Sequence, residues 1–149
     1  MTGRGDGRRL ASLCLLAFLP WTATIYPGGT GLVFPWGLLS TSPTFGLVPI
    51  TEYYFTHTYA QGLPPHLLAW GVGTLVYAFA VVSAAIGTTT GREDRRVTAA
   101  LLLVAAVAHL RFTVGTDHGG ITSVPVGPAA LLLVAWWFHA GDLRRITAP

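Results

Sequence analysis

Residues 97–115 read VTAALLLVAAVAHLRFTVG, an apolar run broken by one histidine and one arginine, His109 and Arg111. A helix needs about 17 to 25 predominantly apolar residues to cross about 30 Å of hydrocarbon. The run has that length and predicts a membrane-spanning helix. Its histidine and arginine then either take part in the function of a membrane protein or only anchor the helix in its place.

Three further runs share this length and character: residues 10–26, 66–87 and 121–140. Together the four runs predict an all-α membrane protein with four transmembrane helices, folded as a single domain over residues 1–149. A long outer loop, residues 27–65, joins the first two helices. This loop is rich in aromatic residues and carries one acid or base apart from histidines. We therefore expect it to be ordered rather than a flexible tether.

The composition agrees with a lipid environment. The chain is 52% hydrophobic and 10% charged, with a mean hydropathy of +0.56, whereas a soluble domain carries about 25% charged residues. The basic residues stand in short groups between apolar runs, so no nucleic-acid partner is expected. A single cysteine, Cys14, excludes an intrachain disulfide and a cysteine-rich metal site.

The arginines predict an orientation. Eight of the nine would fall on one side of a membrane crossed four times: Arg4, Arg8, Arg9, Arg92, Arg95, Arg96, Arg144 and Arg145. The opposite connections, residues 27–65 and 116–120, contain neither lysine nor arginine. Short loops rich in basic residues stay in the cytoplasm. The pattern predicts cytoplasmic termini and a multi-pass protein of the cell membrane.

Two helix starts carry signals of their own. Arg8 and Arg9 ahead of an apolar segment also fit a secretory signal peptide, but no A-x-A cleavage site follows Leu19, so we expect a retained helix. Residues 90–93, TGRE, match a capping box at the start of the third helix.

Five segments occur in a characteristic order along the chain: LVFPWGLL at 32–39, GLPPHLLAW at 62–70, GREDRRVTAALLLVA at 91–105, VPVG at 124–127 and VAWW at 134–137. In these segments, over most of its length, the chain resembles a family of small haloarchaeal integral membrane proteins of unknown function. The resemblance implies a membrane protein. It implies no active residues and no cofactor.

His109 and Arg111 are separated by about 200° around a helix and cannot share a face. Arg111 lies about 21 Å along the helix from Val97, below the outer edge of the hydrocarbon. We expect an internal partner for Arg111, either Asp117, Glu52 or loop carbonyls; an anionic ligand or lipid headgroup is the alternative. His109 is expected to form an interhelical hydrogen bond, with a proton relay as the alternative.

The predicted outer side gathers further polar residues: Glu52, His57, His66, Asp117 and His118. Imidazoles with a carboxylate could bind zinc or copper, but their spacing matches no ligand motif, and scattered loop residues are the simpler interpretation. The sequence contains no nucleotide-binding, hydrolase or dinucleotide fingerprint. It nominates no cofactor and leaves an enzymatic role open without naming its chemistry.

These observations favour a structural or accessory component of a membrane assembly, in contact with the lipid bilayer and with a membrane-protein partner or a second copy. Two alternatives stay open. The first is a small transporter or ion-conducting oligomer that uses His109 and Arg111. The second is a metal-dependent enzyme of the outer face.

Overall fold

The computed structural model describes residues 3–58 and 62–147, and the side chains of these except at positions 3, 4, 57, 139 and 142–147. The elements follow in the order α1 (Gly3–Leu16), β1 (Thr22–Tyr26), β2 (Gly29–Phe34), β3 (Gly37–Ser40), β4 (Gly46–Pro49), α2 (Ile50–Glu52), η1 (Tyr53–His57), α3 (Pro65–Thr90), α4 (Arg95–Thr116), β5 (Thr122–Val124) and α5 (Val126–Thr147). The fold is therefore a mixture of helices and an antiparallel sheet.

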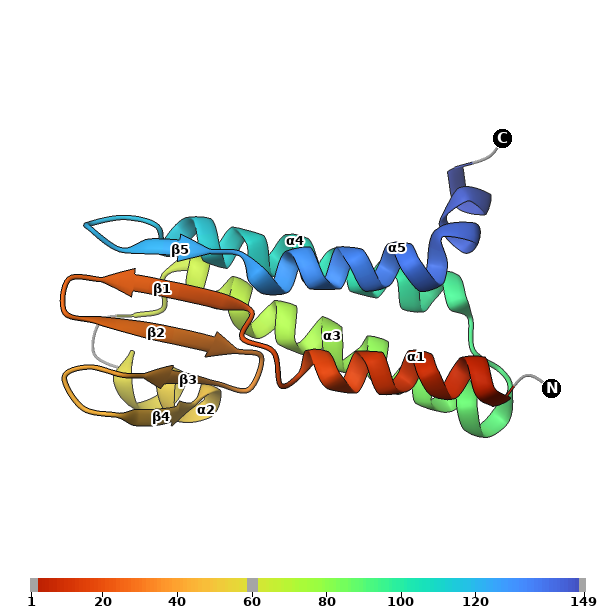
Figure 1. Cartoon of the computed structure of the whole chain (residues 1–149), viewed down its shortest axis with the longest axis horizontal. Coiled ribbons are helices and arrows are strands. Elements are labelled where there is room, and N and C mark those ends of the chain that lie inside the picture. Colours follow the sequence, from red (N-terminus) through yellow and green to blue (C-terminus); the bar gives the residue numbers. More distant parts are fainter. Residues whose placement is uncertain (1–2, 59–61, 148–149) are drawn as a thin grey trace.

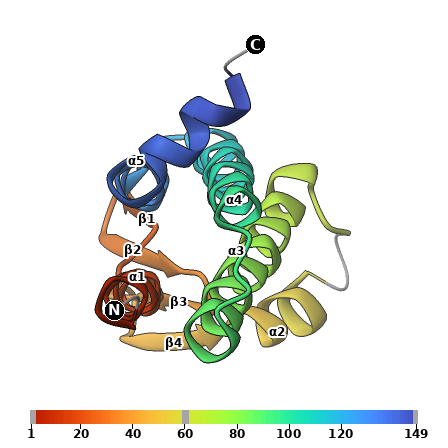
Figure 2. The same cartoon turned by 90° about the vertical axis from the view of Figure 1, so that its right-hand side faces the viewer.

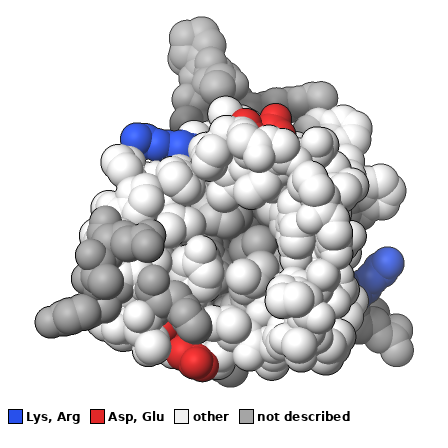
Figure 3. Space-filling view, turned by 90° about the vertical axis from the view of Figure 1, so that its left-hand side faces the viewer, with Lys and Arg blue, Asp and Glu red and all other residues white. Residues whose placement is uncertain are grey.

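A helical bundle and a sheet lie end to end along the long axis of the molecule (Figure 1). The helix α1 packs on α3, α3 on α4, α4 on α5, and α5 on α1, and Figure 2 shows these four helices side by side around the axis. Both chain ends lie at the end of the bundle away from the sheet (Figure 1). Seen from the sheet end, the described surface has few charged side chains and is hollowed near its centre (Figure 3).

The predicted all-α fold with four transmembrane helices is wrong. Residues 22–26 and 122–124 are strands rather than parts of the first and fourth helices, and the predicted outer loop contains β2, β3 and β4. Within the described residues only α3 and α4 are long and apolar enough to cross a membrane. The helix α1 has 14 residues and begins with a charged turn, and the described apolar part of α5 is short, Val126–Phe138.

The sheet has the strand order β4-β3-β2-β1-β5 and is antiparallel throughout. Two-residue turns join β1 to β2, where Tyr26 pairs with Gly29, and β2 to β3, where Phe34 pairs with Gly37. Gly28 in the first turn has a φ of 100°, a backbone conformation open to glycine at little cost. Both edges of the sheet are short, β5 having three residues and β4 four.

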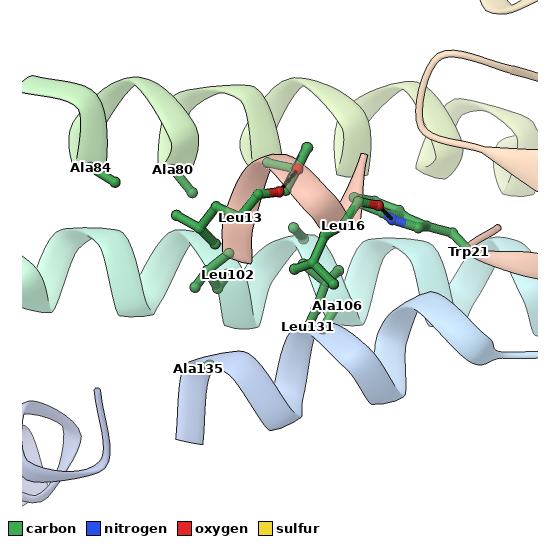
Figure 4. Close-up of a cluster of buried hydrophobic side chains, with 11 residues drawn as sticks. Leu13, Leu16, Trp21, Ala80, Ala84, Leu102, Ala106, Leu131 and Ala135 are labelled. Atoms are coloured by element: carbon green, nitrogen blue, oxygen red, sulfur yellow. Dashed lines mark hydrogen bonds between the residues drawn. The ribbon is translucent and has the colours of Figure 1, made fainter. Parts of the chain in front are cut away.

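The core lies between the helices and is built largely from small residues on α3 and α4. Ala80, Ala84, Ala105 and Ala106 let these two helices approach closely. Larger side chains fill the remaining space: Leu13, Leu16, Trp21 and Leu131 from other parts of the chain, and Leu102 from α4 itself (Figure 4). Tyr77 of α3 belongs to the same cluster. Trp21 is fully buried, and its indole Nε1 donates to the Leu16 carbonyl at 2.9 Å. This bond fixes the step from α1 into β1.

The start of α4 differs in detail from the predicted capping box. Asp94 is the N-cap, and its Oδ1 accepts from the Arg96 amide at 3.0 Å. Thr90 instead belongs to α3, where its hydroxyl donates to the Ile86 carbonyl at 2.7 Å. Nearby, the Arg95 guanidinium donates to Asp6 at 3.2 Å, which ties the start of α1 to the start of α4.

Candidate functional site

A cavity of about 220 Å³ lies between one face of the sheet and the adjoining ends of α3 and α4. Seven of its lining residues are apolar: Gly31, Val33, Leu38, Leu67, Trp70, Phe112 and Ile121. Five others carry hydroxyl groups: Thr24, Tyr26, Ser40, Tyr53 and Thr116. Among these described residues none is charged, so the cavity suits an uncharged occupant.

Strand alternation builds the roof of the cavity. Residues two apart on a strand face the same side of a sheet. Thr24 and Tyr26 on β1 therefore face the helices, as do Leu38 and Ser40 on β3. Gly31 on the intervening β2 opens the space between them, because a Cβ there would lie 2.5 Å from Thr24 Oγ1 and 3.7 Å from Leu38 Cδ1.

An aromatic group forms the floor. The Trp70 ring lies 5.6 Å from the ring of Tyr53 and 5.7 Å from that of Phe112, between centroids. Its Nε1 donates to the Phe34 carbonyl at 3.0 Å, which joins α3 to β2. Thr74 Oγ1 donates to the Pro35 carbonyl at 2.7 Å one turn further along. Several independent contacts thus hold the sheet over the helix ends, and the cavity is preformed.

Most hydroxyls of the lining already have internal partners. Tyr26 Oη lies 3.1 Å from Ser40 Oγ, and Ser40 Oγ donates to the Ser42 carbonyl at 2.9 Å. Thr24 Oγ1 donates to the Gly31 carbonyl at 3.2 Å. Burial raises the pKa of the Tyr53 phenol above 10.0, so that hydroxyl is protonated at neutral pH. The hydroxyl oxygens keep capacity to accept a bond from a ligand.

A closed ring of hydrogen bonds lies next to this cavity, around the buried His109. Thr113 Oγ1 donates to the carbonyl of His109 at 3.0 Å, which directs the proton of Thr22 Oγ1 to Thr113 Oγ1 at 2.7 Å. Thr22 Oγ1 then accepts from His109 Nε2–H at 3.1 Å. The partner of His109 is therefore a strand residue rather than another helix.

Aromatic rings enclose the His109 imidazole. Trp21 meets it edge-on at 4.9 Å, and the ring of Phe112, which also lines the cavity, lies 5.1 Å away. Its Nδ1 is buried and has no hydrogen-bond partner among the described atoms. The bond from His109 to Thr22 joins β1 to α4.

Arg111 lies on a different face of α4 and is exposed. In the described part of the chain it forms neither an ion pair nor a hydrogen bond, so the expected bond to Asp117 or Glu52 is not formed. It borders an apolar groove between α3 and α4. His109 and Arg111 thus lie in separate environments, one enclosed and one on the surface.

The residues of the predicted metal site do not converge. The rings of His66 and His118 lie 6.1 Å apart between centroids. Asp117 Oδ1 instead accepts from the Ser123 amide at 3.2 Å, and Glu52 belongs to the short helix α2. The side chain of His57 lies outside the described residues. Over the side chains that are described, no three histidines, cysteines or acids gather to hold a metal.

The sequence interpretation missed the cavity residues of the sheet. The alternation T-A-T-I-Y in residues 22–26, followed by a Pro-Gly turn, is a strand and hairpin signal. Because this segment follows the apolar helix α1 closely, a hydropathy plot shows the two as one continuous apolar run. A second signal lay in the Gly-rich segment 28–31, GGTG.

Comparison with known sequences finds one family. Residues 2–149 match a family described as a domain of unknown function, which agrees with the predicted membership of a family without an assigned activity. No curated protein and no solved structure matches the chain.

Proposed function

The chain belongs to the family described as Domain of unknown function (DUF8050), and we propose that it is a membrane-embedded accessory protein that holds a small, uncharged, mainly apolar molecule at the membrane surface. In this proposal the hairpin of α3 and α4 spans the bilayer, and the sheet forms a head with the ligand cavity. The observation that carries the proposal is the partly open, uncharged cavity at the sheet end of an apolar helical hairpin.

The surface of α3 supports the membrane location. Six large apolar side chains at intervals of three or four residues are about half exposed: Leu68, Val72, Leu75, Phe79, Val82 and Ile86. They form one stripe about 27 Å long at 1.5 Å per residue, close to the hydrocarbon thickness of about 30 Å. Soluble monomers rarely expose so long an apolar surface.

Burial within the hairpin separates this case from the core helix of a soluble protein. Only 33% of the most apolar window of α3 and 44% of that of α4 is buried. Many of the other residues are exposed and apolar, including Val104, Val107 and Val114 on α4. A helix with apolar residues on all sides must be surrounded by protein or by lipid. Lipid can cover the exposed apolar side chains of α3 and α4.

The turn between the two helices favours an orientation. Arg92, Arg95 and Arg96 cluster there, while the sheet strands contain no charged residue. Basic residues beside membrane helices favour the cytoplasmic side. The head with its cavity would then face outward, where a membrane-protein partner or a second copy could reach it.

The cavity chemistry defines the ligand class. Its lining is apolar apart from hydroxyl groups and contains no charge, so a charged ligand would lose hydration without gaining an opposite charge. An uncharged molecule with one hydrogen-bond donor meets the free acceptor capacity of the hydroxyls.

The test compares two tryptophan substitutions on opposite faces of β3. Leu38→Trp places a ring into the cavity, and Leu39→Trp adds the same volume on the other face. Each variant is purified in lipid nanodiscs, its fold is checked by circular dichroism, and bound small molecules are extracted for mass spectrometry. We expect an uncharged molecule with the wild type and with Leu39→Trp, and its loss from Leu38→Trp. Equal recovery from both folded variants, or none from the wild type, would refute the cavity's role.

A further inference from the structure

Two apolar grooves lie along the exposed face of α3 and α4, and each contains one arginine. The first, of about 420 Å³, includes Leu68, Val72 and Val107 in its walls and Arg111 at the sheet end. The second, of about 380 Å³, includes Phe79, Val82, Ile86 and Leu101 in its walls and Arg92 at the turn end. In both grooves the apolar walls lie toward the middle of the hairpin and the guanidinium lies toward its end.

The two grooves follow one stripe of the hairpin. Leu68, Val72, Phe79, Val82 and Ile86 are spaced by three, four or seven residues, so they share one face of α3. On this helix Pro65 borders the first groove and Ile86 the second. These residues are about 31 Å apart along the axis at 1.5 Å per residue. That separation matches the hydrocarbon thickness of a bilayer, about 30 Å.

Both arginines lack a partner within the described structure. Arg111 and Arg92 are exposed, and no ion pair or side-chain hydrogen bond to either is present among the described residues. Arg95, by contrast, pairs with Asp6 at 3.2 Å. A cation at the edge of a lipid-facing apolar surface is costly unless an anion or water meets it. The lining of each groove contains no carboxylate, because the other lining residues are apolar or hydroxyl-bearing.

We propose that this face of α3 and α4 binds one anionic phospholipid in each leaflet, with a lipid phosphate on Arg111 and another on Arg92. The acyl chains lie along the apolar grooves, and each planar guanidinium donates to two phosphate oxygens. Each groove runs from apolar walls to a guanidinium, as an anionic phospholipid runs from its acyl chains to its phosphate. This inference rests on the proposed membrane span of α3 and α4 and adds two ligand sites to it.

The test measures lipid binding by native mass spectrometry. The full chain in detergent is titrated with phosphatidylglycerol, with phosphatidylcholine or with inorganic phosphate. We expect two retained phosphatidylglycerol molecules, about tenfold weaker retention of phosphatidylcholine, and no displacement by inorganic phosphate. Arg111→Gln and Arg92→Gln should each lose one lipid, and the double variant both. Arg95→Gln is the matched control and should keep both lipids, because Arg95 pairs with Asp6.

A second pair of variants tests the groove without changing charge. Val107→Trp fills the first groove, while Leu110→Trp adds a ring at another exposed position of α4 outside its lining. The first should lose one lipid and the second none. Equal retention by the wild type and both arginine variants, or displacement by inorganic phosphate, would overturn the lipid sites. Release of the protein from membranes by alkaline carbonate would instead overturn the membrane span itself.

Discussion

At the scale of single residues, the ring around His109 is the least replaceable polar feature of the described structure. Thr22, His109 and Thr113 are each at most 2% exposed, and every hydroxyl and N–H proton in the ring has an acceptor. Burying a donor without an acceptor costs more than the bond contributes when it is made. The ring therefore holds β1 on α4 only as a complete unit.

Thr22→Val removes the hydroxyl that links the other two members while keeping the shape of the side chain. It leaves His109 Nε2–H without an acceptor, and we expect a loss of about 1 to 3 kcal/mol in the free energy of unfolding. Thermal unfolding in nanodiscs, followed by circular dichroism, gives the measurement. Thr22→Ser keeps the hydroxyl and should lie close to the wild type. Equal melting temperatures for the Val and Ser variants would show that the ring does not stabilise the fold.

At the scale of elements, the apolar runs predict α3 and α4, whereas they conceal the strands of the sheet. The runs 66–87 and 97–115 agree with Pro65–Thr90 and Arg95–Thr116 to within three residues, because long apolar periodicity dominates there. The strands are four to six residues long apart from β5, and they contain no charged residue that would separate them from the apolar helices beside them. Their pairing depends on distant partners, such as Ala23 with Val124. Apolar content alone does not reveal such pairings.

The same limit applies to the candidate site. His109 and Arg111 stood out in the sequence because they are polar within an apolar run, and the structure places both in distinct environments. The cavity residues are common apolar and hydroxyl types that stand out only once the strands are assembled. The five candidate metal ligands share nothing but an expected side of the membrane. Among those whose side chains are described, the rings of His66 and His118 approach each other, but no three such residues gather.

The start of α5 supplies a prediction at this scale. Gly127 packs against Trp21, and a Cβ there would lie 2.6 Å from Trp21 Cα and 2.4 Å from Trp21 Cβ. Its amide also donates to the Trp21 carbonyl at 2.7 Å. Gly127→Ala must therefore displace either the fully buried Trp21 or α5, and we expect a loss of about 1 to 3 kcal/mol in unfolding free energy.

Gly141→Ala is the matched control in the same helix, because a Cβ there meets no atom within 4 Å. It should leave the melting temperature unchanged or raise it slightly, since alanine favours helix over glycine. The two variants differ only in position along α5. If Gly127→Ala melts together with Gly141→Ala, the contact between α5 and the entry to β1 does not contribute to stability.

At the scale of the whole molecule, the sheet and the turn between α3 and α4 lie at opposite ends of one long axis (Figure 1). If the hairpin spans a bilayer, the segments that adjoin α3 and α4 at the sheet end must share one side, while the turn lies on the other. Two separate segments of the head, the β3–β4 connection and β5, should therefore lie on the same side of the membrane. Agreement between them is a sharper test than the location of either alone.

This arrangement can be tested by labelling single cysteines. The starting variant is Cys14→Ser, which removes the only natural cysteine. Thr44→Cys reports on the β3–β4 connection, Thr122→Cys on β5, and Thr89→Cys on the last turn of α3; all three positions are exposed. In intact cells a membrane-impermeant maleimide should label Cys at 44 and 122 and spare Cys at 89, which reacts only after lysis. Labelling of all three in intact cells, or of 44 and 122 from opposite sides, would be incompatible with a hairpin that carries the sheet on one face of the membrane.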